Sequence, residues 1–272
     1  MAKYAILSDI HANLEALEVV LEKCKHLDPQ MKFVCLGDIV GYNANPRECL
    51  AIVRSLGCER TVLGNHDQYV SFDDPEMEGF NVNAKAAVLW TREQLTEDER
   101  AYLGQARLRE GVPGTNMTLV HATLDSPDQW GYIFDQHHAQ SSFSYQFSQL
   151  CFCGHSHVPV AFRKKPFSFG DDRTYEEIRE WAPEIDAEAN PEVFLHESCI
   201  SVKLEAGHKY LFNIGSIGQP RNHDPRASFA VYDSSAMTVS RYCLPYDVET
   251  TQAKIRAAGL PERLANRLVF GI

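Results

Sequence analysis

The chain has 272 residues, of which 44% are hydrophobic and 23% are charged, so it can fold around a substantial core. Its formal net charge of -11 disfavours a nucleic-acid polymer or an anionic membrane as partner, because both would be repelled. No apolar run approaches the roughly 20 residues of a membrane span, and the first residues do not form a signal peptide. We therefore expect a cytoplasmic protein, and the sequence leaves its oligomeric state undetermined.

The eight cysteines are scattered along the chain and form no C-x-x-C pair. Most of them lie among apolar residues, which is typical of reduced and buried thiols. Cys151 and Cys153 alternate along a predicted strand, so we expect them to pack in the core rather than to bind a metal ion.

The first sixty residues alternate apolar strands with helical patterns. Residues 3–8 form an apolar run that is typical of a buried strand, and residues 32–36 and 61–63 predict two more. Asn13 lies between the first two strands, where it can cap a helix that continues to Cys24. The order strand, helix, strand, helix, strand indicates an α/β architecture.

The second of these helices has clear signals at both ends. Asn45 can cap its start, and Pro46 suits the first helical position. Glu48 would complete a capping box with Asn45, and Gly57 would end the helix.

The rest of the chain is first helical and then rich in strands. Residues 83–95 predict a helix, and Thr96 with Glu99 opens another through a second capping box. The later predicted strands are 117–120, 150–153, 158–162, 200–204, 210–213, 229–232 and 237–243. Because no linker separates these parts, we expect a single domain, residues 1–272, that contains two sheets.

An acidic segment, residues 164–199, interrupts this pattern. It contains three prolines and no apolar periodicity, so we expect an insertion within the domain. Between Asp171 and Glu197 it carries ten acidic and two basic residues, which account for most of the net negative charge. The remainder of the chain is close to neutral, which favours a small substrate over a long polyanion crossing the insertion.

Polar side chains follow five of the predicted strands. They are Asp9 with His11, then Asp38, then Asn65 with His66 and Asp67, then His121, and finally His155 with His157. In open α/β sheets, ligands bind beyond the carboxyl ends of the strands, so we expect these side chains to converge on one site.

The residue types at this site suit metal ions. Imidazoles, carboxylates and an amide oxygen are ligands that Mn²⁺, Fe, Zn²⁺, Co²⁺ and Ni²⁺ accept. Seven such groups exceed the needs of one tetrahedral ion and suit two ions that share a carboxylate. Two ions roughly 3.5–4 Å apart are the usual clamp for in-line displacement at phosphorus.

The order of the motifs, D-x-H, G-D, G-N-H-D, a lone V-H and G-H-x-H, resembles the calcineurin-like metallophosphoesterase superfamily. The resemblance is to its small bacterial and archaeal phosphodiesterase-type members, and residues 213–221 (NIGSIGQPR) resemble a late loop of that branch. It implies an α/β fold of four layers (αββα), in which two mixed β-sheets pack together and helices cover the outside. It also implies a metal-dependent hydrolase of phosphoric esters.

The same resemblance implies a role for each metal ligand. The residues of the first ion would be Asp9, His11, Asp38 and His157. Asp38 would bridge to a second ion, whose other ligands would be Asn65, His121 and His155. We expect manganese ahead of iron, zinc, nickel or cobalt, and a hydroxide between the two ions would attack phosphorus.

Further residues would act on the substrate. By resemblance, His66 would bind the phosphoryl group together with Asn65 and would protonate the leaving oxygen. Asp67 is interpreted as orienting His66, with a structural turn carboxylate as the alternative. Arg221 is a candidate phosphate-binding cation, with a surface salt bridge as the alternative. The aromatic segment 128–134 is a candidate lid, with a place in the core as the alternative.

Two departures from related enzymes narrow the expected activity. Serine/threonine phosphatases of this superfamily carry GDxVDRG and GNHE motifs, whereas residues 37–43 here lack the arginine and Asp67 replaces the glutamate. We therefore expect a phosphodiesterase that cleaves phosphodiester or phosphoanhydride bonds in small, nucleotide-like substrates. The alternatives are a phosphomonoesterase or protein phosphatase of the same fold and a non-catalytic scaffold. The presence of His66 and all seven candidate ligands disfavours the scaffold.

Overall fold

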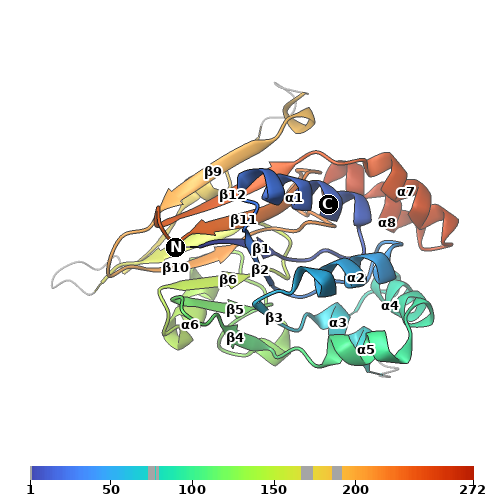
Figure 1. The fold of residues 1–272 in the computed structure, drawn as a ribbon, viewed down its shortest axis with the longest axis horizontal. Coiled ribbons are helices and arrows are strands. Elements are labelled where there is room, and N and C mark those ends of the chain that lie inside the picture. The colour runs from blue at the N-terminus through green and yellow to red at the C-terminus, as the bar shows by residue number, and fades with distance from the viewer. Residues whose placement is uncertain (1, 73–76, 78–79, 167–173, 186–191) are drawn as a thin grey trace.

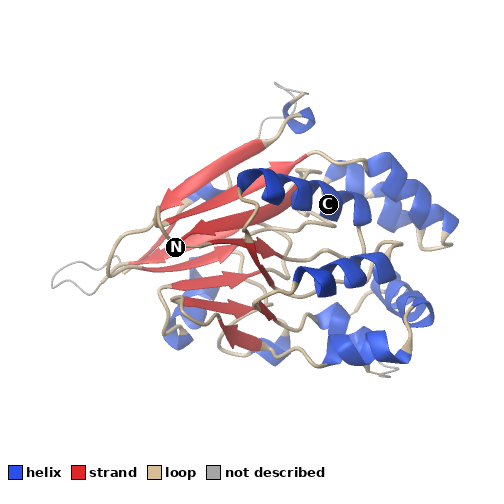
Figure 2. Ribbon diagram, viewed as in Figure 1, coloured by secondary structure: helices blue, strands red, loops and turns tan. Residues whose placement is uncertain are grey.

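Two six-stranded mixed β-sheets pack face to face, and helices cover their outer faces (Figures 1 and 2). The computed structural model describes residues 2–72, 77, 80–166, 174–185 and 192–272. This is the four-layer α/β arrangement that the motif pattern predicts. None of the helices in these ranges combines the length and apolar character that a bilayer crossing requires.

The first sheet has the strand order β3-β2-β1-β11-β12-β9. Its strands are β1 (Lys3–Leu7), β2 (Lys32–Cys35), β3 (Arg60–Thr61), β9 (Ser198–Lys203), β11 (Ala227–Asp233) and β12 (Thr238–Leu244). β1, β2 and β3 run parallel, so their carboxyl ends lie at the same edge of the sheet.

The second sheet has the order β4-β5-β6-β10-β7-β8. Its strands are β4 (Arg109–Gly111), β5 (Met117–Val120), β6 (Leu150–Cys153), β7 (Val160–Lys164), β8 (Tyr175–Glu177) and β10 (Lys209–Asn213). β5, β6 and β10 run parallel, which again gathers the residues that follow them at one edge.

The helices divide between the two outer faces and the end of the sandwich. They are α1 (Leu14–Leu27), α2 (Pro46–Leu56), α3 (Asn65–Ser71), α4 (Val82–Gln94), α5 (Glu97–Gly104), α6 (Gln136–Tyr145), α7 (Val248–Ala257) and α8 (Glu262–Asn266). Apolar residues of α1 and α2 pack on the first sheet, and those of α6 pack on the second. α7 and α8 pack with α4 in a smaller apolar cluster.

The alternation of side chains along β10 shows how the layers separate. Tyr210 and Phe212 point into the core between the two sheets, whereas Leu211 packs on the side of α6. The same alternation places Cys151 and Cys153 on the α6 side of β6, where both are fully buried. Their predicted packing role is confirmed. All eight cysteines are unpaired, although Cys199 is exposed rather than buried.

Local signals explain most of the helix ends. The Asn13 side chain accepts a hydrogen bond from the Ala16 amide at the start of α1, and Thr96 and Glu99 form the predicted capping box of α5. Gly57 ends α2 in the left-handed conformation.

The predicted cap of α2 is wrong in one respect. The Asn45 side chain makes no capping hydrogen bond, and no capping box forms. Instead the main-chain amide of Asn45 donates to the Ala12 carbonyl, which ties the start of α2 to the loop after β1. A tertiary contact thus outweighs the local signal.

The acidic segment does not lie wholly outside the core. β8 pairs with β7, and Trp181 is fully buried with its Nε1 donating to the Asn213 carbonyl at 2.8 Å. Part of residues 164–199 therefore contributes to the core, although the segment has no apolar periodicity. One isolated tryptophan carries no periodicity, so the sequence pattern could not reveal it. Residues 167–173 and 186–191 lie outside the described ranges.

We predict that Phe212→Ala lowers the free energy of unfolding by about 3–5 kcal/mol, because it leaves a cavity in the inter-sheet core. The Phe212 ring is fully buried and contacts the rings of Phe152 and Trp181. Urea unfolding measures the change. The matched control is Phe147→Ala, since Phe147 is 91% exposed and should contribute little. Equal stability of the two variants would contradict this account of the core.

Candidate metal centre

The carboxyl ends of four strands from both sheets deliver the predicted ligands to one place. Asp9 and His11 follow β1, and Asp38 follows β2. His121 follows β5, and the two histidines of the G-H-x-H motif follow β6. Asn65 begins α3 directly after the short β3 segment. All seven predicted ligands are buried, so the sequence-predicted set converges as a whole.

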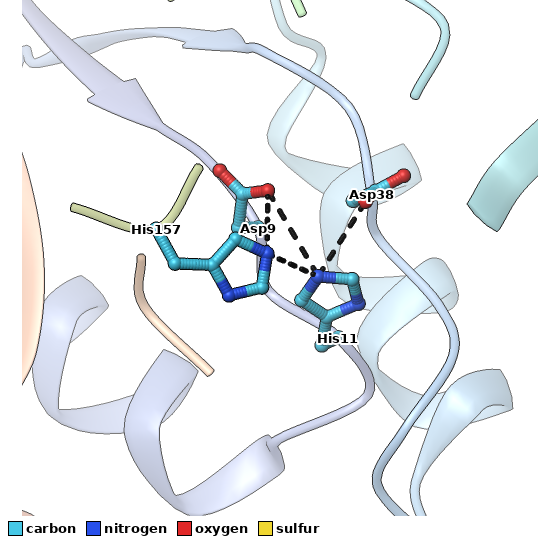
Figure 3. Close-up of side chains that lie close together, drawn as sticks. All are labelled: Asp9, His11, Asp38 and His157. Atoms are coloured by element: carbon cyan, nitrogen blue, oxygen red, sulfur yellow. Dashed lines mark hydrogen bonds and ion pairs between the residues drawn. The ribbon is translucent and has the colours of Figure 1, made fainter. Parts of the chain in front are cut away.

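Asp9, His11, Asp38 and His157 form the first group of ligand atoms (Figure 3). His157 Nε2 lies 3.2 Å from Asp9 Oδ1 and 3.1 Å from His11 Nε2. His11 Nε2 lies 3.5 Å from Asp38 Oδ2. The four side chains point toward a common centre, as a metal ion would require.

Asp38 also belongs to a second group, with His121 and His155. His121 Nε2 lies 3.3 Å from the same Asp38 Oδ2 atom and 3.2 Å from Asn65 Oδ1. The other oxygen, Asp38 Oδ1, accepts a hydrogen bond from the main-chain amide of His66. The Asp38 carboxylate is therefore fixed between the two groups and is shared by both.

Main-chain carbonyls fix the protonation of each imidazole. The Nδ1 atoms of His11, His121 and His157 face the carbonyl oxygens of Val40, Leu36 and Gln219 at 3.0, 2.7 and 2.5 Å. A carbonyl oxygen has no proton to give, so each Nδ1 carries one and donates it. Each Nε2 atom therefore faces the centre, where it could bind a metal ion.

His155 has the opposite orientation. Its Nε2 donates to the Trp130 carbonyl at 2.8 Å, which leaves Nδ1 to face the second group. Burial lowers the pKa of His155 to about 3, and the neighbouring His121 acts in the same direction. The imidazole is thus neutral and free to bind a metal ion.

The first group fits a cation because it contains only acceptors. Burial lowers the pKa of both His11 and His157, so at neutral pH their Nε2 atoms present lone pairs to each other across 3.1 Å. Asp9 adds a carboxylate oxygen to the same space. Such a buried arrangement is repulsive unless a positive ion lies within it. The residues present therefore fit a bound metal ion.

The second group of ligand atoms also requires a positive charge, but here a proton supplies it. Burial alone would raise the pKa of Asp38 and lower that of His121, but their mutual attraction reverses both effects. The pKa of Asp38 falls well below its usual value, and that of His121 rises to about 9. The proton on His121 occupies the place of a cation, and a metal ion would displace it.

Residues 213–221 brace the site from the second sheet. Ser216 Oγ and the Gly218 amide both donate to the main-chain carbonyl of Asp9, each at 2.9 Å. Asn213 Nδ2 donates to the Gly154 carbonyl just before the last two ligands. The loop that resembles the late family motif thus holds the backbone of three ligands in place.

The ligands occupy an unusual backbone conformation. Five of the seven have positive φ, namely Asp9, His11, Asp38, His155 and His157, with values from 49° to 66°. This left-handed region costs energy for residues other than glycine, and strain of this kind concentrates at functional sites. The residues around the site offset this energetic cost. No sequence motif reveals the left-handed conformation.

His66 lies beside the cluster and its Nδ1 has no hydrogen-bond partner among the described residues. Burial lowers its pKa to about 4; the Asp38 carboxylate opposes this shift, and the positive charge of Arg221 acts in the same direction as burial. At neutral pH the imidazole is uncharged in this arrangement. It can offer an N–H to a phosphoryl oxygen, while proton donation to a leaving group requires a negatively charged substrate nearby that raises its pKa.

The side-chain hydrogen bonds of Asp67 go to the main chain rather than to the His66 Nδ1 atom. Asp67 Oδ1 accepts hydrogen bonds from the amides of Ile39 and Val40 at 2.9 and 3.2 Å, which fix the loop after Asp38. Of the two roles that the sequence left open, the contacts are those of the structural turn carboxylate. Burial raises its pKa to about 7, and the nearby Asp38 carboxylate acts in the same direction.

Arg221 lies at the site rather than in a surface salt bridge. Its Nη2 donates to the Tyr42 hydroxyl at 3.2 Å and to Gln219 Oε1 at 2.9 Å. The Tyr42 ring packs against both His11 and His66, with ring centroids 4.6 and 4.3 Å apart. Sequence reasoning missed Tyr42 and Gln219, although both stand within motifs already singled out.

The aromatic segment 128–134 partly covers the second group. The Tyr132 ring stacks on His155 with centroids 4.4 Å apart, and Tyr132 is 45% exposed. Trp130 supplies the carbonyl that orients the same histidine. Tyr132 and Trp130 therefore lie over His155, whereas Ile133 of the same segment is buried in the apolar cluster on the α6 side.

Two sheets joined at a buried histidine–carboxylate cluster define the architecture of a metallophosphoesterase. A family profile described as the calcineurin-like phosphoesterase superfamily domain matches residues 2–173, and the chain belongs to this family. Membership implies a phosphoester hydrolase that uses divalent metal ions.

Individual relatives agree with this assignment. An uncharacterized protein of Methanocaldococcus jannaschii is 34% identical over 98% of this chain and 97% of its own length. The crystal structure of a metallophosphoesterase from Sphaerobacter thermophilus superposes with a TM-score of 0.78 at 33% identity, covering 100% of this chain and 99% of that one. The symmetrical bis(5'-nucleosyl)-tetraphosphatase of Aggregatibacter actinomycetemcomitans is 29% identical over 47% of this chain and 46% of its own.

We predict that Asp67→Asn changes how the stability of the metal-free protein depends on pH. The pKa of Asp67 rises from 3.8 to about 7 on folding, so the folded state binds an extra proton between these values. The wild-type protein should therefore lose stability as pH rises through this window, whereas asparagine does not titrate. Urea unfolding in EDTA at several pH values measures the difference.

The control for this measurement is Asp98→Asn, which alters an exposed carboxylate on α5. Its stability should follow the wild-type pH profile. Parallel profiles for the wild type and Asp67→Asn would show that the pKa of Asp67 is not raised on folding.

Proposed function

We propose that this protein is a binuclear metal-dependent phosphodiesterase that hydrolyses phosphodiester or phosphoanhydride bonds in small, nucleotide-like substrates. The observation that carries the proposal is the single Asp38 carboxylate shared by two buried groups of ligand atoms. One ion needs no bridging carboxylate, whereas a pair of ions held a few ångströms apart does.

The two ions would divide the ligands as the clusters do. Asp9, His11, Asp38 and His157 would hold one, and Asp38, Asn65, His121 and His155 would hold the other. We propose manganese as the metal, since nitrogen and oxygen donors of this kind accept it as well as iron, zinc, nickel or cobalt. When bound, the ions would supply Lewis-acid stabilisation of the phosphoryl group and an activated water.

The chain's own residues would position the substrate around this centre. His66, buried beside Asp38 and without a partner for its Nδ1, would donate to a phosphoryl oxygen. Arg221 would supply a fixed positive charge, since Gln219 and Tyr42 hold its guanidinium. Asn65 would both bind a metal ion and contact the phosphoryl group.

The likeness to a nucleoside tetraphosphatase supports a small nucleotide substrate. The acidic segment supports it too, because a long polyanion would meet repulsion there. The eight unpaired cysteines suit a reducing compartment such as the cytoplasm. We propose no protein, membrane or nucleic-acid partner.

We predict that the Mn²⁺-loaded protein hydrolyses bis-p-nitrophenyl phosphate and binds two metal ions per chain. Asp38→Ala should reduce kcat/KM by about 1,000-fold or more, because it removes a ligand of both ions. Release of p-nitrophenol and elemental analysis after gel filtration measure the two effects. The matched control is Asp98→Ala, which removes an exposed carboxylate on α5 and should match the wild type.

Three results would count against the proposal. Activity that survives Asp38→Ala would exclude the shared-carboxylate mechanism. Faster hydrolysis of p-nitrophenyl phosphate than of the diester would favour the phosphomonoesterase alternative. A protein that binds no transition metal after purification and reloading would favour the scaffold.

A further inference from the structure

A cavity of about 390 Å³ opens beside the metal centre. Asn65 and His66 line it, and so do three arginines: Arg221, Arg263 and Arg267. Arg263 lies on α8, and Arg267 directly follows that helix near the end of the chain. Residues that are far apart in the sequence thus bring three positive charges to the space in front of the predicted substrate-binding histidine.

No Asp or Glu side chain in the described ranges forms an ion pair with any of these arginines. The buried Arg226 shows a different arrangement, since its Nη2 contacts Asp224 Oδ2 at 2.6 Å. The positive charge at the cavity is therefore not balanced by an Asp or Glu side chain of the described residues.

Contacts within the chain hold two of the guanidinium groups in place. Gln219 Oε1 accepts from Arg221 Nη2 at 2.9 Å and from Arg267 Nη1 at 3.1 Å. Arg267 Nε also donates to the main-chain oxygen of Ile272. Burial lowers the pKa of Arg267 to about 10, and the charges of Arg221 and Arg263 act in the same direction. An anion between the arginines would relieve this repulsion.

One phosphodiester group does not account for so much positive charge. Such a group carries a single negative charge, and metal ions at the Asp38 cluster together with Arg221 would already balance it. Arg263 and Arg267 lie on the C-terminal segment, outside the ligand loops. They are suited to an anionic group elsewhere on the same substrate.

We propose that Arg263 and Arg267, with Arg221, form a second anion subsite, which binds a phosphoryl group of the substrate that is not cleaved. The substrates would then be molecules with at least two phosphoryl groups, such as nucleoside polyphosphates, rather than simple diesters. This inference rests on the proposed function for the identity of the cleaved bond, but not for the binding of the second phosphoryl group.

The first test measures binding without catalysis. Isothermal titration in EDTA compares inorganic triphosphate with inorganic phosphate as ligands of the metal-free protein. The wild type should bind triphosphate more tightly than phosphate, and Arg263→Gln should weaken triphosphate binding about tenfold, as the loss of a charge-assisted contact implies. Arg263 is exposed. Its guanidinium forms no hydrogen bond with the other described residues, so Arg263→Gln breaks none.

Matched variants separate a specific contact from a general change in charge. Arg109→Gln removes an exposed arginine on β4, away from the cavity, and should bind triphosphate like the wild type. Arg263→Lys keeps the charge and should retain most of the affinity. Equal binding by the wild type and Arg263→Gln, or equal affinity for phosphate and triphosphate, would overturn the proposal.

The second test uses the Mn²⁺-loaded enzyme. In excess Mn²⁺, kcat/KM is measured for bis-p-nitrophenyl phosphate and for diadenosine polyphosphates with two and four phosphates. Arg263→Gln should lower the ratio of tetraphosphate to bis-p-nitrophenyl phosphate hydrolysis about tenfold. An unchanged ratio would overturn the subsite. If no substrate is hydrolysed, the proposed function fails, and the titration alone decides whether the subsite exists.

Discussion

The structure depends on a concentration of buried hydrogen-bond acceptors at the junction of two sheets. His157 Nε2 lies at about hydrogen-bond distance from both His11 Nε2 and Asp9 Oδ1, although none of the three atoms holds a proton at neutral pH. Water is excluded from these side chains, so their repulsion is not screened. Only a cation makes this packing favourable. The surrounding residues hold the acceptor atoms together before a cation binds.

That surrounding structure explains why the fold needs two sheets. The carbonyls that orient the histidines come from the loop after β2 and from the loop after β10, which belong to different sheets. Neither sheet alone could both present the ligands and fix their tautomers. The inter-sheet core around Phe212 therefore positions the site as well as stabilising the protein.

The sequence predicted which side chains would cluster because each follows an apolar strand, and parallel strands must end at a common edge. It could not decide the role of Asp67, since a turn carboxylate and an orienting carboxylate have the same local sequence. The contacts with Ile39 and Val40 decide it. It also missed Trp181, whose burial depends on a distant strand, and Arg263, because nothing local indicates that α8 packs beside a site whose predicted ligands lie between residues 9 and 157.

The left-handed backbone of five predicted ligands sets backbone stability against metal binding in this chain. At His11, His155 and His157, a change to glycine would relieve conformational strain while removing a metal ligand. Selection for stability and selection for metal chemistry therefore oppose each other at the same positions. A descendant that is no longer selected for metal chemistry should accumulate glycine or asparagine at these three positions first. Those residues would then mark the loss of activity in its sequence.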